Sequence, residues 1–109
     1  MGGGYGDAML VAFSVAPAVA ADDTGSVSEA VAAAIRVVRE SGLPNRTDAM
    51  FTTVEGEWDE VMSVVKGAVD AVAAASPRVS LVLKADIRPG FAGELDAKVA
   101  RIEGLLADD

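Results

Sequence analysis

The chain of 109 residues contains no histidine and no cysteine. Without histidine it lacks the imidazole base and the commonest metal ligand, and without cysteine it lacks thiolate catalysis, thiolate zinc sites and disulfides. An enzyme built from this chain would depend on Asp, Glu, Lys, Tyr, Ser and Thr alone. The composition therefore favours a binding protein over a catalyst, and it predicts neither a metal site nor a cofactor.

Basic side chains are also scarce, because 9 Lys and Arg stand against 17 Asp and Glu, for a net charge of -8. Proteins that bind a nucleic-acid backbone need clustered Lys and Arg, so nucleic acid is not an expected partner. The acidic balance suits a cationic ligand, although it more often serves solubility. No apolar run in the sequence is long enough to cross a membrane, so no membrane partner is expected either.

The length suits one hydrophobic core, which must be aliphatic because only five residues are Phe, Tyr or Trp. We expect a disordered glycine-rich tail over residues 1–7 and a single domain over residues 8–107. The apolar run Ala8–Ala20 resembles a signal-peptide core. No Lys or Arg precedes it, however, and its apolar residues alternate, so we interpret it as beginning with a strand.

Apolar alternation predicts strands over Ala8–Ala16 and Arg78–Ile87, and Asn45–Glu55 is expected to hold two short strands that meet near Ala49 and Met50. Helical periodicity predicts three helices: one from Ser26 to just before Gly42, one over Glu57–Ala75 and one over Gly93–Ala107. The order is β-α-β-β-α-β with a further helix at the end. It predicts an α+β, ferredoxin-like antiparallel sheet with helices on one face, plus a C-terminal helix.

The first helix carries the strongest end signals. Ser26 and Glu29 have the spacing of a capping box, with Ser26 as the N-cap. Its apolar face is predicted to consist of Val27, Val31, Ile35 and Val38.

In this fold one face of the sheet packs on helices and the other is open. The first strand would place Leu10, Ala12 and Ser14 on the open face, and these side chains are small or apolar. Such a face favours cover by another subunit or a ligand, and symmetric self-association is the simplest explanation. The alternative is an ordinary alanine-rich surface in contact with water.

A polar cluster is predicted where the central strand meets the second helix. Glu55 ends that strand beside the hydroxyls of Thr52 and Thr53, and these acceptors suit an exocyclic amine or a cation. The alternative is a strand end followed by a helix whose acidic first turn favours the helix dipole.

Three other residues are weaker candidates. Lys84 and Asp86 share the open face of the last strand, where they could contact a ligand or pair with each other, and Ser14 could line the same surface. Met50 is interpreted, from its residue type alone, as a filler of the core.

Several segments together resemble the small thiamine-binding, YkoF-like proteins, and the resemblance covers about Met9 to Leu106. Its strongest piece is Thr-Val-Glu-Gly-Glu-Trp-Asp-Glu-Val-Met, which ends at Met62. The other matching segments are Ala12–Pro17, Val27–Glu29, Glu40–Pro44, Met50–Thr52, Arg78–Ser80 and Lys84–Asp86.

The resemblance implies a ferredoxin-like fold, dimers or tetramers formed through sheet surfaces, and cytoplasmic binding of thiamine or its hydroxymethylpyrimidine part, without catalytic residues. Carried over by position, the resemblance implies polar contacts from Ser14, Thr47, Thr52, Thr53 and Glu55, followed by Lys84 and Asp86. If a pyrimidine binds there, we expect Phe51 or Met50 to contact its ring face.

The chain departs from this family at the turn between the two short strands. Family members often read Pro-Met-Gly-Thr where this sequence has Ala49-Met-Phe-Thr52, so Phe51 adds bulk beside the expected site. That bulk could stack on a pyrimidine or fill the pocket. If it fills the pocket, the alternative is a homo-oligomeric regulatory or assembly module without such a ligand.

Overall fold

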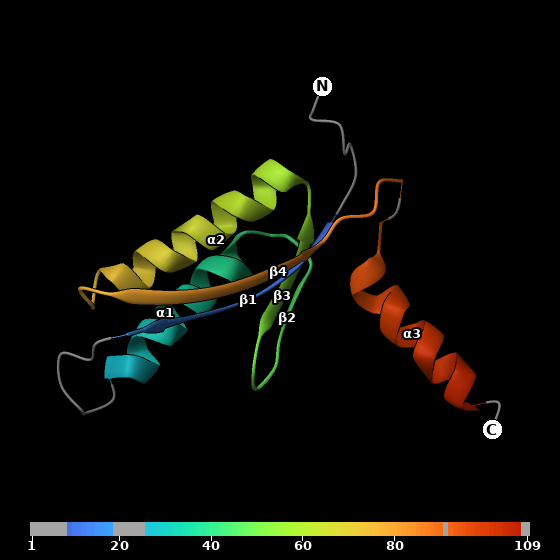
Figure 1. The fold of residues 1–109 in the computed structure, drawn as a ribbon, viewed down its shortest axis with the longest axis horizontal. Helices are drawn as coiled ribbons and strands as arrows, with labels where there is room; N and C mark the ends of the chain where they lie inside the picture. The colour runs from blue at the N-terminus through green and yellow to red at the C-terminus, as the bar shows by residue number, and fades with distance from the viewer. Residues whose placement is uncertain (1–8, 19–25, 91, 108–109) are drawn as a thin grey trace.

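A computed structural model of the chain describes residues 9–18, 26–90 and 92–107, so the tail expected over residues 1–7 lies outside the described part. Four strands and three helices follow one another along the chain (Figure 1). They are β1 (Met9–Pro17), α1 (Ser26–Glu40), β2 (Asn45–Thr47), β3 (Thr52–Gly56), α2 (Trp58–Ala73), β4 (Val79–Asp86) and α3 (Glu94–Ala107).

The strands form one antiparallel sheet in the order β2-β3-β1-β4. β1 and β4 pair over the longest stretch, from Leu10 opposite Asp86 to Pro17 opposite Val79. The shorter strand β3 pairs with β1 only as far as Phe13 opposite Thr52. This arrangement confirms the predicted α+β, ferredoxin-like fold with an additional C-terminal helix.

The core lies between the sheet and the two helices α1 and α2, which cover one face of it (Figure 1). β1 alternates between buried and half-buried side chains, as a central strand with one packed face must. Phe13 is its largest fully buried residue, at 1 % exposure. The core side chains of β1 are Met9, Val11, Phe13 and Val15, and those of α2 are Val61, Val65, Ala68 and Val72.

The predicted apolar face of α1 was wrong by part of a turn. Its buried residues are Ala30, Ala34 and Val38, whereas Val27 is 43 % exposed. Alanine at the centre of this face lets α1 approach α2 closely, and a Cβ added to Gly67 of α2 would lie 3.0 Å from a methyl carbon of Val37. In a segment that is apolar on two faces, the period alone does not show which face packs inward.

The beginning of α1 also differs from the expectation. The helix starts at Ser26 itself, so this residue is the first helical position and not the residue before the helix. The side chain of Ser26, on which the predicted capping box depends, lies outside the described part of the structure.

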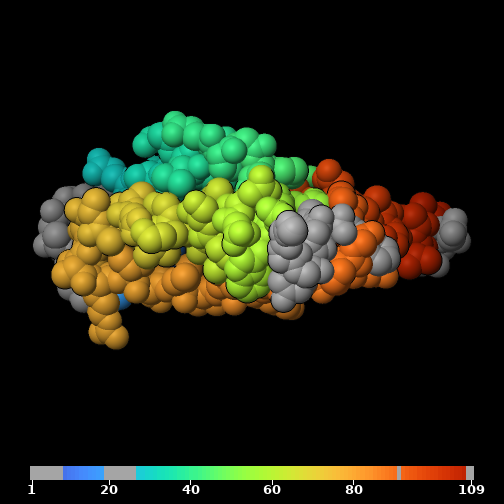
Figure 2. Space-filling view, turned by 90° about the horizontal axis from the view of Figure 1, so that it is seen from above, coloured from blue at the N-terminus to red at the C-terminus, as the bar shows by residue number. Residues whose placement is uncertain are grey.

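α3 lies apart from the other helices and extends beyond the body of the molecule, where it is drawn in red (Figures 1 and 2). The radius of gyration is 15.7 Å, compared with about 13 Å expected for a compact domain of this length. Several apolar side chains of α3 are half exposed or more, namely Val99, Ile102, Leu105 and Leu106. Within the described residues, no helix combines the length and apolar character that crossing a membrane requires.

Candidate functional site

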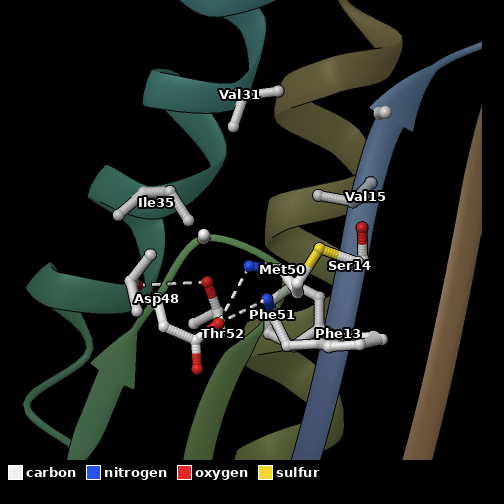
Figure 3. A pocket seen from close by; sticks show the side chains of 12 residues that line it. Phe13, Ser14, Val15, Val31, Ile35, Asp48, Met50, Phe51 and Thr52 are labelled. Atoms are coloured by element: carbon white, nitrogen blue, oxygen red, sulfur yellow. Dashed lines mark hydrogen bonds between the residues drawn. The ribbon is translucent and has the colours of Figure 1, made fainter.

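A cavity of about 230 Å³ lies between α1, the β2–β3 turn and the second half of β1 (Figure 3). We call it the turn cavity. It forms there because β3 begins at Thr52, opposite Phe13. The part of β1 beyond Phe13 therefore has no β3 residue beside it. Its polar lining residues are Ser14, Thr47, Asp48 and Thr52, and its larger apolar lining residues are Phe13, Val31, Ile35, Met50 and Phe51.

Backbone groups of β1 also reach this cavity. The N–H of Ala18 donates to the carbonyl of Arg78 at 2.8 Å, on the side of β4. Successive residues of an antiparallel strand direct their N–H and C=O to alternate sides. The backbone of Val15 therefore faces the side on which β3 is missing, and Val15 lines the cavity.

Two hydroxyls meet at the floor of the turn cavity. Thr47 and Thr52 stand opposite each other in the β2–β3 register, and their Oγ1 atoms lie 3.1 Å apart. Thr52 is buried at 4 % exposure, whereas Thr47 is exposed. The pair therefore presents one accessible hydroxyl that is held in place by a buried one.

The β2–β3 turn is organised by Asp48. Its Oδ1 accepts the backbone N–H groups of Met50 at 2.9 Å and Phe51 at 3.0 Å, which is an Asx-type turn (Figure 3). The N–H groups of Phe51 and Met50 lower the pKa of the Asp48 carboxyl. Within the described part of the chain no donor reaches the second oxygen, Oδ2. An ionised carboxylate with one unused oxygen thus stands at the cavity.

The aromatic and thioether side chains of the turn form part of the wall. Phe51 is half-buried and lines the cavity, which stays open beside it. Met50 lines the same cavity and is 72 % exposed, so its interpretation as a core filler was wrong. The residue sits at the tip of the turn, where no other described segment covers it.

A second cavity, of about 460 Å³, lies on the open face of the sheet, and we call it the sheet cavity. Lys98 of α3 donates a hydrogen bond to Asp86 there, and this bond lowers the pKa of the Asp86 carboxyl. Asp86 is therefore paired across to α3, while Lys84 forms no ion pair within the described residues. The lining consists of Leu10, Ala12, Thr53, Lys84, Ala85, Asp86 and Lys98.

Glu55 has a third environment. It is buried, at 5 % exposure, and its carboxylate accepts backbone N–H groups from the start of α3. Oε2 accepts from Gly93 and Glu94, and Oε1 accepts from Leu95. Both oxygens are thus already engaged with the protein.

The predicted site residues therefore separate into three places. Ser14, Thr47, Met50, Phe51 and Thr52 meet in the turn cavity, Thr53, Lys84 and Asp86 meet in the sheet cavity, and Glu55 lies beneath α3. Within the described ranges no group of three or more acidic side chains gathers as a metal site would require.

The family assignment rests on a match over most of the chain, because residues 11–103 match the family described as thiamine-binding protein. The chain belongs to the thiamine-binding protein family. A UPF0045 protein of Mycobacterium bovis is 56 % identical over 99 residues, which cover 90 % of this chain and 94 % of that protein. A UPF0045 protein of Synechocystis is 37 % identical over 82 residues, which cover 74 % of this chain and 68 % of that protein.

Solved structures of similar proteins share the fold. A DUF77 domain of unknown function from Bacillus cereus superposes with a TM-score of 0.76 at 36 % identity, over 85 % of this chain and 88 % of that one. A protein of Thermotoga maritima named for thiamine biosynthesis or salvage superposes with a TM-score of 0.70 at 28 % identity, over 85 % and 98 % of the two chains.

For this member of the thiamine-binding protein family, sequence reasoning missed two parts of the turn cavity. Asp48 was not singled out, although an aspartate just before a short turn is a recognised turn signal. Val31 and Ile35 were assigned to the core, but they are half-buried and line the cavity from α1. Only the position of α1 against the turn, which no local pattern contains, brings them there.

Proposed function

We propose that the protein is a non-catalytic binding protein for thiamine or its hydroxymethylpyrimidine part, with the pyrimidine ring in the turn cavity. The observation that carries this proposal is the convergence of hydroxyl, carboxylate and aromatic groups on one ring-sized space. Cavities for drug-sized ligands measure about 300–1,000 Å³. A volume of about 230 Å³ therefore suits one ring better than the two rings of thiamine.

The chemistry of an aminopyrimidine matches the groups around the turn cavity. Its exocyclic amine is a donor, and Asp48 Oδ2 is an unused anionic acceptor, which makes a strong charge-assisted bond possible. Its ring nitrogens are acceptors, and the Thr47 hydroxyl and the Val15 N–H are available donors. The flat ring face would lie against Phe51.

This assignment gives Glu55 a structural role in place of the ligand contact that the sequence suggested. Its oxygens already accept three N–H groups at the start of α3, and the residue is buried at 5 % exposure, so a ligand amine has little access to it. The residues proposed to bind the ligand are Ser14, Val15, Thr47, Asp48, Met50, Phe51 and Thr52. The cytoplasm is the proposed location, on the family resemblance.

The experiment is calorimetric titration of hydroxymethylpyrimidine and of thiamine into two matched variants, Thr47→Val and Thr53→Val. The two substitutions are chemically identical, but Thr47 lines the turn cavity and Thr53 lines the sheet cavity. A lost hydrogen bond of about 1 kcal/mol corresponds to about fivefold weaker binding in Thr47→Val, with Thr53→Val unchanged. Weaker binding only in Thr53→Val would move the ligand to the sheet cavity, and no binding to the wild type would refute the proposal.

A second candidate function is assembly through self-association, and the exposed apolar side chains of α3 favour it. Ile102 is 57 % exposed and Leu105 is 67 % exposed, while Val82 on the open sheet face is 55 % exposed. A second copy of the chain would cover such surfaces in a symmetric dimer or tetramer. Sedimentation of the wild type and of Ile102→Ser tests this, because an assembly formed through α3 would dissociate in the variant. A monomeric wild type would refute it.

A further inference from the structure

A third hollow, of about 620 Å³, adjoins the turn cavity along α1. It shares Ile35 and Thr47 with the turn cavity, so the two spaces meet at these side chains. Its other lining residues are Ala32, Arg36, Arg39 and Glu40. A ring in the turn cavity would therefore lie next to a surface that carries two guanidinium groups.

The charge of this hollow is unusual for the protein. Arg36 and Arg39 are exposed and stand three positions apart on a helix, which makes them neighbours on its surface. Within the described residues neither of them forms an ion pair, including with Glu40 in the same hollow. The basic residues that do form ion pairs are Arg46, Lys66, Arg88, Lys98 and Arg101.

We infer that Arg36 and Arg39 form a phosphate subsite, so that the preferred ligand is a phosphate ester of the pyrimidine compound. This inference rests on the proposed function, because it needs the ring in the turn cavity. Guanidinium groups bind phosphate oxygens through paired N–H donors, and an arginine without a protein partner keeps those donors available. In a chain with a net charge of -8, two such groups beside one cavity supply the attraction that an anionic substituent needs.

The charges of Arg36 and Arg39 also predict the order of affinity among related compounds. The thiazolium ring of unphosphorylated thiamine is a cation and would meet two guanidinium groups, so thiamine should bind more weakly than hydroxymethylpyrimidine. A phosphate on either compound adds negative charge, which the two guanidinium groups attract. Glu40 opposes the phosphate, and its removal should therefore strengthen binding of the esters.

A structural role is the alternative explanation for Arg39. Its charge, in the last turn of α1, would then only complement the negative end of the helix dipole. The test is calorimetric titration of four compounds: hydroxymethylpyrimidine, its phosphate, thiamine and thiamine phosphate. The double variant Arg36→Gln/Arg39→Gln is compared with Lys66→Gln/Arg78→Gln. The control variant loses the same two charges from exposed positions that line none of the three cavities, and Lys66 pairs there with the exposed Asp70.

We expect a phosphate ester to bind the wild type about three- to tenfold more tightly than its parent alcohol, which is the strength of one or two exposed charge pairs, and added salt should reduce this gain. This difference in affinity between ester and alcohol should disappear in Arg36→Gln/Arg39→Gln, persist in the control variant and increase in Glu40→Gln. A gain limited to the hydroxymethylpyrimidine pair or to the thiamine pair identifies which ester the subsite serves.

Two results would overturn the subsite while leaving the proposed function in place. The first is that the alcohol binds and the phosphate ester binds with equal affinity. The second is that both double variants lose the tighter binding of the ester to the same extent. The second result would mean that overall charge, not the α1 arginines, attracts the phosphate. Failure of all four compounds to bind would overturn the proposed function and the subsite together.

Discussion

The Oε1 atom of Glu55 accepts the backbone N–H of Leu95 at 3.2 Å, although 40 positions separate the two residues in the chain. The other carboxylate oxygen accepts the N–H groups of Gly93 and Glu94. The first N–H groups of a helix have no partner within the helix, and an anion at this end also favours the helix dipole. A side chain from β3 thus provides the N-terminal cap of α3, which makes few other contacts with the sheet.

The first prediction concerns this cap. Glu55→Gln replaces one acceptor oxygen by an NH₂ group that faces N–H donors, and the substitution also removes the charge. We expect the free energy of unfolding, measured by urea denaturation, to fall by about 1–3 kcal/mol. Glu103→Gln, on the exposed surface of α3, is the matched control and should change stability by less than about 0.5 kcal/mol.

Ligand binding separates the structural role of Glu55 from the ligand contact that the sequence suggested. Under the structural role, folded Glu55→Gln retains the wild-type affinity for hydroxymethylpyrimidine. Loss of that affinity without loss of stability would contradict it, and would return Glu55 to the binding site.

The second prediction concerns the exposed ion pair between Lys98 and Asp86, which joins α3 to β4. Exposed pairs contribute about 0–1 kcal/mol because water and salt screen them. Lys98→Met should therefore lower the free energy of unfolding by less than about 1 kcal/mol, and added salt should reduce the difference. A loss as large as that of Glu55→Gln would mean that the ion pair, not the cap, holds α3.

The third prediction is a pH dependence that originates at Asp48. Hydrogen bonds from the N–H groups of Phe51 and Met50 lower its pKa in the folded protein. The group therefore contributes stability above its unfolded pKa of about 3.9, and this contribution is lost as the pH falls through the lower folded value. An NMR titration of the side-chain carboxyl carbon should give a midpoint below 3.9. A midpoint at or above 3.9 would mean that the Asx turn does not persist in solution.

Local patterns predicted much of the fold and part of the site. β1 was found because Val11 and Phe13 alternate with smaller residues, and Thr52 was included as a hydroxyl near Glu55. Its partner Thr47 was included only through the family resemblance. The partner of Glu55 could not be predicted in this way. The sequence places Glu55 beside the start of α2, whereas the structure uses its carboxylate to cap α3.

The basic hollow beside the turn cavity could not be predicted for a similar reason. Arg36 and Arg39 look like the ordinary solvent-facing charges of an amphipathic helix. Their relevance depends on where α1 lies against the β2–β3 turn, and on the fact that no carboxylate among the described residues pairs with them, not even Glu40 in the same hollow. Both properties arise only from the packing of distant segments.

The fourth prediction concerns Phe51, the aromatic residue of the β2–β3 turn. Phe51 lines the turn cavity without closing it, so we expect its ring to contact the ligand ring. Aromatic contacts of this kind contribute about 0.5–1.5 kcal/mol, so Phe51→Leu should weaken binding of hydroxymethylpyrimidine about two- to tenfold. Phe51→Tyr should retain the affinity because it keeps the ring. Met50→Leu, at the exposed tip of the same turn, replaces one apolar contact by another and should change the affinity less.

Thiamine itself distinguishes the two roles that Phe51 could have. If Phe51 mainly occupies space that a second ring would need, Phe51→Leu would bind thiamine more tightly than the wild type, because the smaller side chain enlarges the cavity. If Phe51 forms a stacking wall, both compounds would bind more weakly and in similar proportion. We expect the second result, since a cavity of about 230 Å³ persists with the phenyl ring in place. Tighter binding of thiamine alone would show that the aromatic residue restricts this protein to the single-ring ligand.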